Sequence, residues 1–172
     1  MPTRLPLLAL AVAAAVSLSA CDSGDAIDDP TPADVAGLYD FAAFRFTPQA
    51  TALPAVSVTD TLVAGDSFVR LFDGGQLTLE FRRQGGVARF VPGTFEVRRR
   101  EVRMTFAGGN EETLGRLLLP QTLTFTRADD GLAASTPLTA NLEGYDPQRY
   151  GGGTFRAVPG TLTVRLVPRS GS

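Results

Sequence analysis

The sequence predicts an all-β protein, an antiparallel meander that closes into a β-barrel of about 8–10 short strands. Three observations indicate this class. Apolar and polar residues alternate along most of residues 67–106, where Leu77, Leu79 and Phe81 form one apolar row. Such period-two alternation places successive side chains on opposite faces of a strand. Glycine-rich turns separate the alternating runs, and similar runs recur up to residue 168.

The first strand is expected at residues 37–46. Its aromatic residues fall on both faces, two before Ala42 and two after Ala43, so a β-bulge is expected at this point. Two prolines make residues 47–54 a loop. A weaker second strand is expected at residues 55–63, before a glycine-containing turn leads into the meander.

Three consecutive arginines, Arg98, Arg99 and Arg100, interrupt the meander, and Arg103 lies close by. They predict a hairpin turn with glutamate–arginine pairs across the two strands, each contributing about 0.2–1 kcal/mol. The alternative is that these arginines form a cluster that binds lipid phosphates or an acidic polymer. We favour the hairpin, because glutamates share the polar face with these arginines.

Beyond residue 106 the sequence predicts shorter elements. Asn110 is positioned to cap a short helical turn that has two glutamates near its positive end. Residues 121–127 alternate cleanly and predict a strand, and Asp-Asp-Gly at 129–131 predicts a turn. The remaining expected elements are a strand at 138–143, a flexible loop at 145–153, extended structure at 154–157 and a last strand at 160–168.

The start of the chain has the features of a secretory signal. Arg4 is followed by an uncharged run, residues 5–16, rich in leucine, alanine and valine. The run is shorter than the roughly 20 helical residues that span a bilayer, and it fits a signal-peptide core. The next residues read LSAC and end at Cys21. All four match a lipobox, so the chain resembles bacterial lipoproteins.

The lipoprotein resemblance implies a signal peptide at residues 1–20, cleavage before Cys21, a diacylglyceryl group on its sulfur and N-acylation. The implied partner is a membrane, reached through the lipid on Cys21, and the implied location is the cell envelope. The resemblance does not say whether the membrane is the inner or the outer one, or which face the protein occupies. It names no protein partner. The alternative is an ordinary secretory signal in which a cysteine falls at this place by chance. Cys21 is the only cysteine, so no disulfide can form within the chain.

Residues 21–34 are expected to form an acidic, disordered tether that begins at the lipid-bearing cysteine. The segment has many aspartates and little apolar content, so it cannot bury enough surface to offset its ordering entropy. The aspartates are interpreted either as a sorting signal or as a solvated spacer. The β-barrel domain is assigned to residues 35–168 and a disordered tail to residues 169–172.

The amino-acid composition limits the catalytic groups and metal ligands that the chain can supply. The chain has no histidine, and all 16 of its basic residues are arginines. Without histidine the usual general base and the commonest metal ligand are missing, and without lysine there is no Schiff base and no P-loop. We therefore predict that the protein is not an enzyme and holds no metal or cofactor. The folded part is close to neutral, which argues against nucleic acid as a partner.

The meander also resembles the lipocalin-like domains of bacterial lipoproteins. The residues that carry this resemblance are Gly37-x-Tyr39, Leu71-x-Asp73-Gly74-x-x-Leu77-x-Leu79, Gly93-Thr94-Phe95 and Val102-x-Met104-Thr105-Phe106. The likeness extends over most of the folded part. It implies a barrel whose interior can hold a small ligand.

Two functions follow from this pattern. The first is an envelope lipoprotein whose lipocalin-like barrel binds or presents a small apolar ligand. The expected ligand-binding residues line the barrel interior and are Leu79, Phe81, Phe95, Met104, Phe106 and Phe125. The alternative is a structural, assembly or interaction component of the envelope, with a barrel filled by its own side chains. Large inward residues favour the filled barrel, whereas the resemblance favours a pocket.

Overall fold

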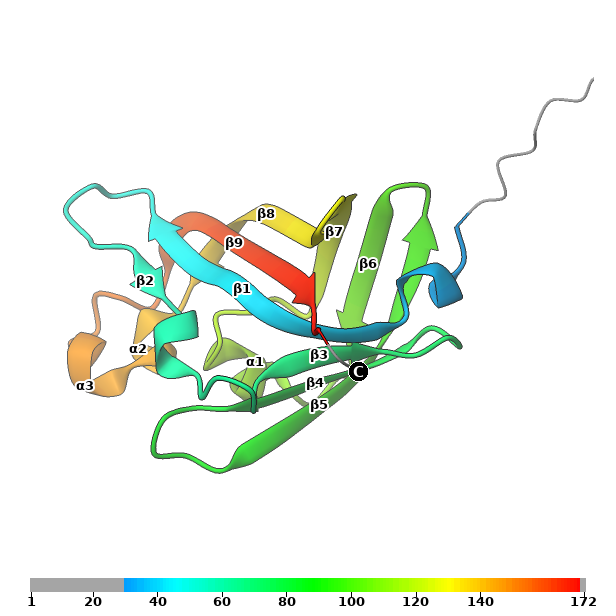
Figure 1. The fold of residues 1–172 in the computed structure, drawn as a ribbon. Helices are drawn as coiled ribbons and strands as arrows, with labels where there is room; N and C mark the ends of the chain where they lie inside the picture. Colours follow the sequence, from blue (N-terminus) through cyan, green and yellow to red (C-terminus); the bar gives the residue numbers. More distant parts are fainter. Residues whose placement is uncertain (1–29, 171–172) are drawn as a thin grey trace, which may run out of the picture.

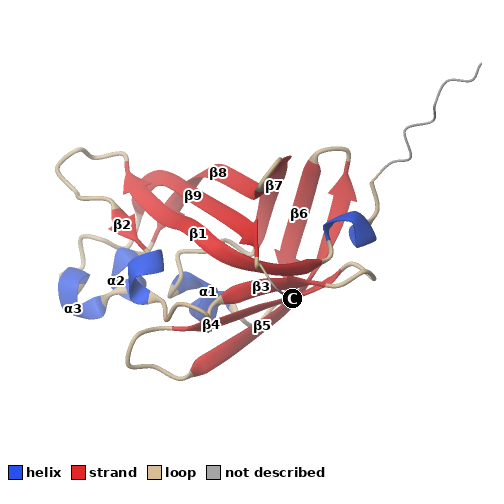
Figure 2. Cartoon of the chain, viewed as in Figure 1, coloured by secondary structure: helices blue, strands red, loops and turns tan. Residues whose placement is uncertain are grey.

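The computed structural model describes residues 30–170. The predictions for the signal peptide, for Cys21 and for most of the tether therefore lie outside the described residues. Nine strands and several short helical segments make up the described part (Figure 1, Figure 2). The strands are β1 (Gly37–Pro48), β2 (Val56–Ser57), β3 (Phe68–Leu71), β4 (Gln76–Arg82), β5 (Ala88–Arg98), β6 (Glu101–Phe106), β7 (Thr122–Ala128), β8 (Gly131–Ala140) and β9 (Val158–Pro168).

The helical segments are short. Two are 3₁₀-helices, η1 (Pro32–Val35) and η2 (Thr59–Thr61). Three are α-helices of four or five residues, α1 (Glu111–Gly115), α2 (Leu142–Tyr145) and α3 (Pro147–Tyr150). Within residues 30–170, no helix is long and apolar enough to cross a membrane.

The strands form one antiparallel sheet that closes on itself. Its order is β2-β1-β3-β4-β5-β6-β7-β8-β9, and β9 also pairs with β1. Apart from β2, each strand therefore pairs with its neighbours along the chain, and the first and last strands close the ring. This is an up-and-down barrel of eight strands, with β2 as a short addition on β1, and it confirms the predicted all-β barrel class.

A β-bulge shifts the register of β1 at the predicted place. The pairing with β9 slips between Phe41 and Ala43. Tyr39 is buried before the bulge, and Phe44 and Phe46 are buried after it. The extra residue rotates the strand, so aromatic residues of odd and even number both reach the interior.

The barrel has two different ends. Short hairpins join β3 to β4, β5 to β6 and β7 to β8 at one end, where the described chain also begins and ends; we call this the hairpin end. The other end, which we call the helical end, carries the long connections with η2, α1, α2 and α3 and the β4–β5 hairpin. Figure 1 shows the three α-helices gathered at this end, and η1, in blue, at the opposite end.

Two Pro-Gly pairs mark close approaches inside strands. A Cβ atom on Gly93 of β5 would lie 2.4 Å from the carbonyl oxygen of Thr105. A Cβ on Gly160 of β9 would lie 2.4 Å from the carbonyl oxygen of Thr47. Only glycine allows backbone to come this near. In β5 the pairing passes at Gly93 from β4 to β6, so the glycine sits where the strand turns the corner of the barrel.

The weaker sequence-based elements are corrected by the structure. The strand predicted at 55–63 is only Val56–Ser57, followed by η2. The strand predicted at 138–143 is instead β8, which ends at Ala140, and the chain continues into α2. The predicted flexible loop at 145–153 contains α3, and residues 154–157 are not a strand.

Both predicted edges of the folded region are also corrected. η1 begins at Pro32, inside the predicted tether, and its Val35 is buried. In the predicted tail, Arg169 donates to both carboxylate oxygens of Asp40, with Nη2 2.5 Å from Oδ1. This ion pair fastens the end of β9 to the start of β1.

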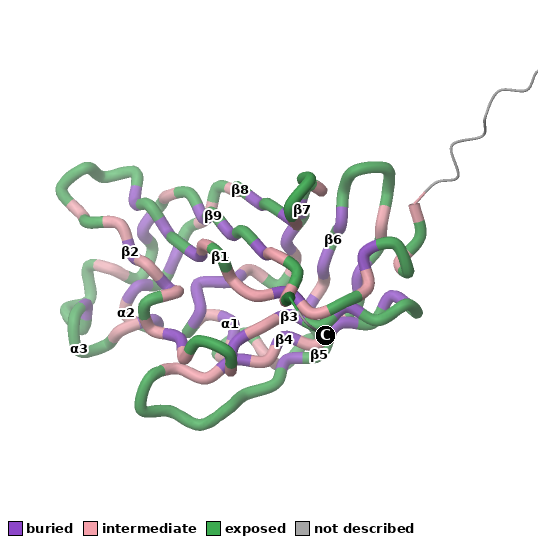
Figure 3. Tube along the Cα trace, in the orientation of Figure 1, coloured by how far each residue is buried: buried purple, intermediate pink, exposed green. Residues whose placement is uncertain are grey.

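Buried residues alternate with exposed ones along the strands and line the inside of the barrel (Figure 3). Among residues 30–170, thirty-three buried apolar residues form one contiguous cluster. The core therefore fills the space that the sheet encloses.

Candidate functional site

The structure brings all six predicted ligand-binding residues together inside the barrel. Each is at most 4% exposed, and all belong to the single apolar cluster. Phe95 pairs directly with Met104 across β5 and β6, and Leu79 lies opposite Val91. These side chains therefore lie in the densely occupied core.

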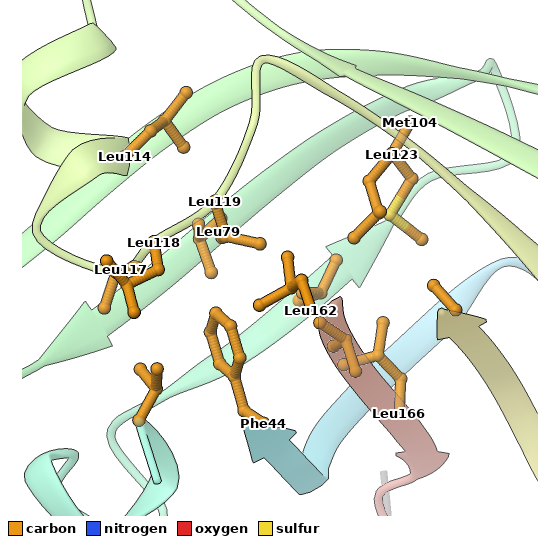
Figure 4. Close-up of a cluster of buried hydrophobic side chains, with 14 of the residues drawn as sticks. Phe44, Leu79, Met104, Leu114, Leu117, Leu118, Leu119, Leu123, Leu162 and Leu166 are labelled. Atoms are coloured by element: carbon orange, nitrogen blue, oxygen red, sulfur yellow. The ribbon is translucent and has the colours of Figure 1, made fainter. Parts of the chain in front are cut away.

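A segment after β6 closes the helical end of the barrel from inside. α1 contributes Leu114, and Leu117, Leu118 and Leu119 follow it; all four are buried. We call these four residues the leucine plug. Figure 4 shows Leu117, Leu118 and Leu119 near Phe44 and Leu79, and Leu114 further out, beside α1.

The backbone bends sharply to insert this plug. Leu118 has a φ of 57°, in the left-handed region that residues other than glycine seldom adopt. The Leu119 amide donates to the Leu114 carbonyl at 3.0 Å, which stops α1 after little more than one turn. Burial of several leucines together is what holds Leu118 in this unfavourable conformation.

The hairpin end is covered by η1. Val35 is 3% exposed, and its carbonyl accepts a hydrogen bond of 2.9 Å from the Tyr39 hydroxyl. Burial raises the pKa of Tyr39 above its ordinary value. The glycine at position 75, in the β3–β4 hairpin, approaches Pro32 of η1. The filled interior thus has a cover at each end.

The helical end carries a hollow that is built from three separate connections. It measures about 550 Å³, within the range of about 300–1,000 Å³ typical of ligand pockets. We call it the helical-end cleft. Its lining residues are Arg83, Glu111, Glu112, Gly115, Arg116, Asn141, Gly144, Tyr145 and Pro147.

A smaller hollow of about 240 Å³ adjoins this cleft, beside the β4–β5 hairpin. We call it the arginine hollow. It is lined by Phe81, Arg83, Gly86, Val87, Arg89 and Arg116. Arg83 and Arg116 line both hollows, so their side chains stand between them.

Arg83 is held in place by α2. Its Nη1 donates to the Tyr145 carbonyl at 2.9 Å, and its Cζ lies 4.9 Å from the centre of the Tyr145 ring. Tyr145 is buried, and its hydroxyl donates to the Ser57 carbonyl at 3.4 Å. Burial is the main cause of its raised pKa. The β4 end, α2 and β2 are therefore tied together around Arg83.

The remaining charges of the cleft lie on α1. Arg116 Nη2 is 2.6 Å from Glu112 Oε1, an i,i+4 ion pair. Glu111 Oε1 accepts a hydrogen bond of 3.1 Å from the Gly109 amide. Backbone hydrogen bonds lower the pKa of Glu111. Both carboxylates therefore already have partners.

Short side-chain caps position the helices behind the cleft. Asn141 Oδ1 accepts from the Gly144 amide at 3.0 Å and starts α2. Asp146 Oδ1 accepts from the amides of residues 148 and 149, and Pro147 occupies the first turn of α3. These are ordinary helix-start signals.

The cleft residues on α2 and α3 were not predicted, because glycines and Asp-Pro suggested a loop at 145–153, whereas Glu111 and Glu112 lie on the short helical turn that the sequence does predict. The signal in the sequence that points to the residues on α2 and α3 is the cap pattern at Asn141 and Asp146.

The arginine-rich hairpin lies at the hairpin end. Arg99 has a φ of 53° in the turn. Glu96 pairs with Arg103, and Arg98 with Glu101, across β5 and β6. The predicted hairpin, with glutamates opposite arginines across the two strands, is therefore confirmed, but Arg98 forms its ion pair with Glu96 of its own strand, Nη2 to Oε2 at 3.3 Å.

A shallow depression of about 640 Å³ at the hairpin end lies beside β1 and the β3–β4 turn, and its charged lining residues are Arg70 and Asp73. Within residues 30–170, no group of three or more aspartates, glutamates, histidines or cysteines is placed to hold a metal ion.

The fold places the described chain in a structural class, the closed, lipocalin-like, up-and-down β-barrel. No family model matches this chain, and no curated protein matches it. Among solved structures, an uncharacterized protein from Bacteroides eggerthii aligns with 76% of this chain and 99% of its own, with 11% identity and a TM-score of 0.35. A TM-score this low carries no argument about function.

Proposed function

We propose that this chain is a lipid-anchored protein of the cell envelope that binds a small molecule in the helical-end cleft. One observation carries the choice of site. The barrel interior is filled and covered at both ends, while the long connections of the helical end build a cleft of about 550 Å³. We infer a binding module rather than an enzyme, because the chain lacks the histidine and lysine that most often serve as general base and Schiff-base nucleophile.

The lipobox supports the anchor. The LSAC motif at Cys21 directs lipid to the cysteine, and the described chain enters the barrel at the hairpin end (Figure 1). Residues 21–30 span at most about 30 Å when fully extended. An anchor at Cys21 then keeps the hairpin end near the membrane, and the cleft at the opposite end faces the aqueous side.

The test of the anchor is metabolic labelling. The full-length chain and its Cys21→Ala variant are expressed in a bacterial host with labelled palmitate. The wild type is expected to carry the label and the variant to lack it. Equal labelling of the two proteins overturns the anchor.

The test of the binding site uses Gly115, which lines the cleft. A Cβ placed on Gly115 meets no atom within 4 Å. A tryptophan at this position is therefore expected to occupy the cleft without disturbing the core. The matched control is Gly152→Trp, because Gly152 also has room for a side chain but does not line the cleft.

The full-length protein is purified from its own membrane and examined by native mass spectrometry. A small molecule is expected to accompany the wild type and Gly152→Trp, and to be lost from Gly115→Trp. Retention of the molecule by Gly115→Trp places it elsewhere and contradicts the proposal. A wild type with no bound molecule also contradicts it.

The second candidate function is an interaction component of the envelope. It is favoured by two apolar residues that face solvent near the β4–β5 hairpin, Val87 at 74% and Phe90 at 60% exposure. Its test is cross-linking of the full-length protein in its own membrane, with Val87→Ser and Phe90→Ser as comparisons. Loss of a cross-linked partner in both variants supports this function.

A further inference from the structure

The arginine hollow combines positive charge with an absence of negative charge. Arg83, Arg89 and Arg116 line it from the ends of β4 and β5 and from the end of α1. None of its lining residues is acidic. The two glutamates nearby line the adjoining cleft instead.

Two of the three arginines also lack a carboxylate partner among residues 30–170. Arg83 donates to a backbone carbonyl, and Arg89 forms no ion pair with a described residue. A guanidinium has five N–H donors in a planar fork that matches a carboxylate or a phosphate. Donors therefore remain free for an anion.

The rest of the hollow is apolar. Phe81, a core residue that is 1% exposed, is one of the lining residues. Val87 stands at the rim, 74% exposed, and Gly86 adds no side chain. Apolar surface next to unpaired arginines suits a molecule that is charged at one end and apolar at the other.

We propose that the arginine hollow binds the anionic head, a carboxylate or a phosphate, of an amphiphilic small molecule. Its apolar chain lies against Phe81 and Val87, and a longer chain continues into the helical-end cleft. The proposal rests on the proposed function and names its ligand class. Arg83 is already oriented by Tyr145, so it contributes a fixed donor to the head group.

The experiment measures binding of eight-carbon probes to the full-length lipidated protein in phosphatidylcholine nanodiscs, by calorimetry with empty nanodiscs as the blank. The probes are octanoate, octyl phosphate, octanol and octyltrimethylammonium. Octanoate or octyl phosphate is expected to bind, and the neutral and cationic probes to bind at least about tenfold more weakly. Which anionic probe binds better separates a fatty acid from a phosphate ester.

Three variants locate the head group. Arg89→Gln removes an arginine without an ion-pair partner and is expected to weaken the anionic probe about tenfold. Arg83→Gln is expected to act likewise, but it also breaks the bond to Tyr145, so Arg89→Gln is the decisive variant. The control is Arg82→Gln, which removes the same charge from the end of β4, next to Arg83, where the arginine is paired with Asp66 and does not line the hollow.

Two results overturn this inference. One is equal binding of octanol or the cationic probe. The other is an equal loss of affinity in Arg82→Gln and Arg89→Gln, which indicates a general charge effect. The two proposals fail separately. Suppose that native mass spectrometry finds a neutral or cationic molecule on the wild type and none on Gly115→Trp. This result contradicts the proposed anionic head group but supports the cleft as the binding site.

Discussion

Truncation of the leucine plug tests whether these side chains fill the barrel or only cover it. Leu117 is fully buried, at 0% exposure. Leu117→Ala removes apolar contacts and leaves a cavity, and such changes cost about 2–5 kcal/mol, here taken as about 3. With an unfolding entropy of about 2.1 cal/mol/K per residue over roughly 140 residues, 3 kcal/mol lowers Tm by about 10 °C.

The assay is thermal and urea unfolding of the full-length protein, with Val87→Ala as the control. Val87 is 74% exposed, so its truncation is expected to change stability by less than about 0.5 kcal/mol. The m-value is expected to stay the same in both variants. A Leu117→Ala protein as stable as Val87→Ala shows that the plug is a loose cover, and refutes the filled barrel.

Three further predictions test the register of β5 and β6, the close backbone approach at Gly93 and the ion pair between Glu143 and Arg156. Phe95→Asp and Met104→Asp are expected to unfold the domain in circular dichroism, while Thr94→Asp and Thr105→Asp fold; similar behaviour of the two pairs contradicts the register. Gly93→Ala is expected to lower the free energy of unfolding, measured with urea, by more than about 1 kcal/mol, because the new Cβ meets a carbonyl oxygen. Gly115→Ala in α1 is expected to raise it by a few tenths of a kcal/mol. The opposite order of stabilities contradicts the close approach at Gly93. The hydrogen bond from Arg156 lowers the pKa of Glu143, so its stabilising effect is complete above about pH 4.3 and is lost as pH falls through the lower, folded-state value. Wild type is therefore expected to lose stability more steeply than Glu143→Gln below about pH 4.3, and parallel curves count against this ion pair.

The strands that alternate strictly were predictable from the sequence. Leu77, Leu79 and Phe81 give β4 one buried face, and the aromatic residues around Ala42 reveal the bulge of β1. In these segments each local preference agrees with the tertiary fold, because one face of each strand meets the core.

The strand β8 was largely missed because its residues are small and include Pro137. β8 pairs with β7 only from Gly131 to Ala133. Beyond that point one edge of β8 has no strand partner, so a proline there is tolerated. Burial against the rest of the barrel makes the segment a strand, and this tertiary effect has no local signature.

The candidate site was the least predictable part. Alternation identified the six interior residues and showed that they share a face, but it does not tell a lined cavity from a filled one. The plug that fills the space comes from residues 114–119, which do not belong to a strand. Two arginines of the site, Arg83 and Arg89, flank the β4–β5 hairpin, and the third, Arg116, reaches them from the connection between β6 and β7 only in the folded chain.

A crystal structure of the protein under xenon pressure tests the filled interior most directly, because xenon enters apolar cavities that are large enough to hold it. The wild type is expected to show no xenon inside the barrel, and Leu117→Ala is expected to show a xenon site beside the truncated side chain. Xenon in the wild-type barrel among Leu79, Phe95 and Met104 would contradict the filled barrel and return the binding site to its interior.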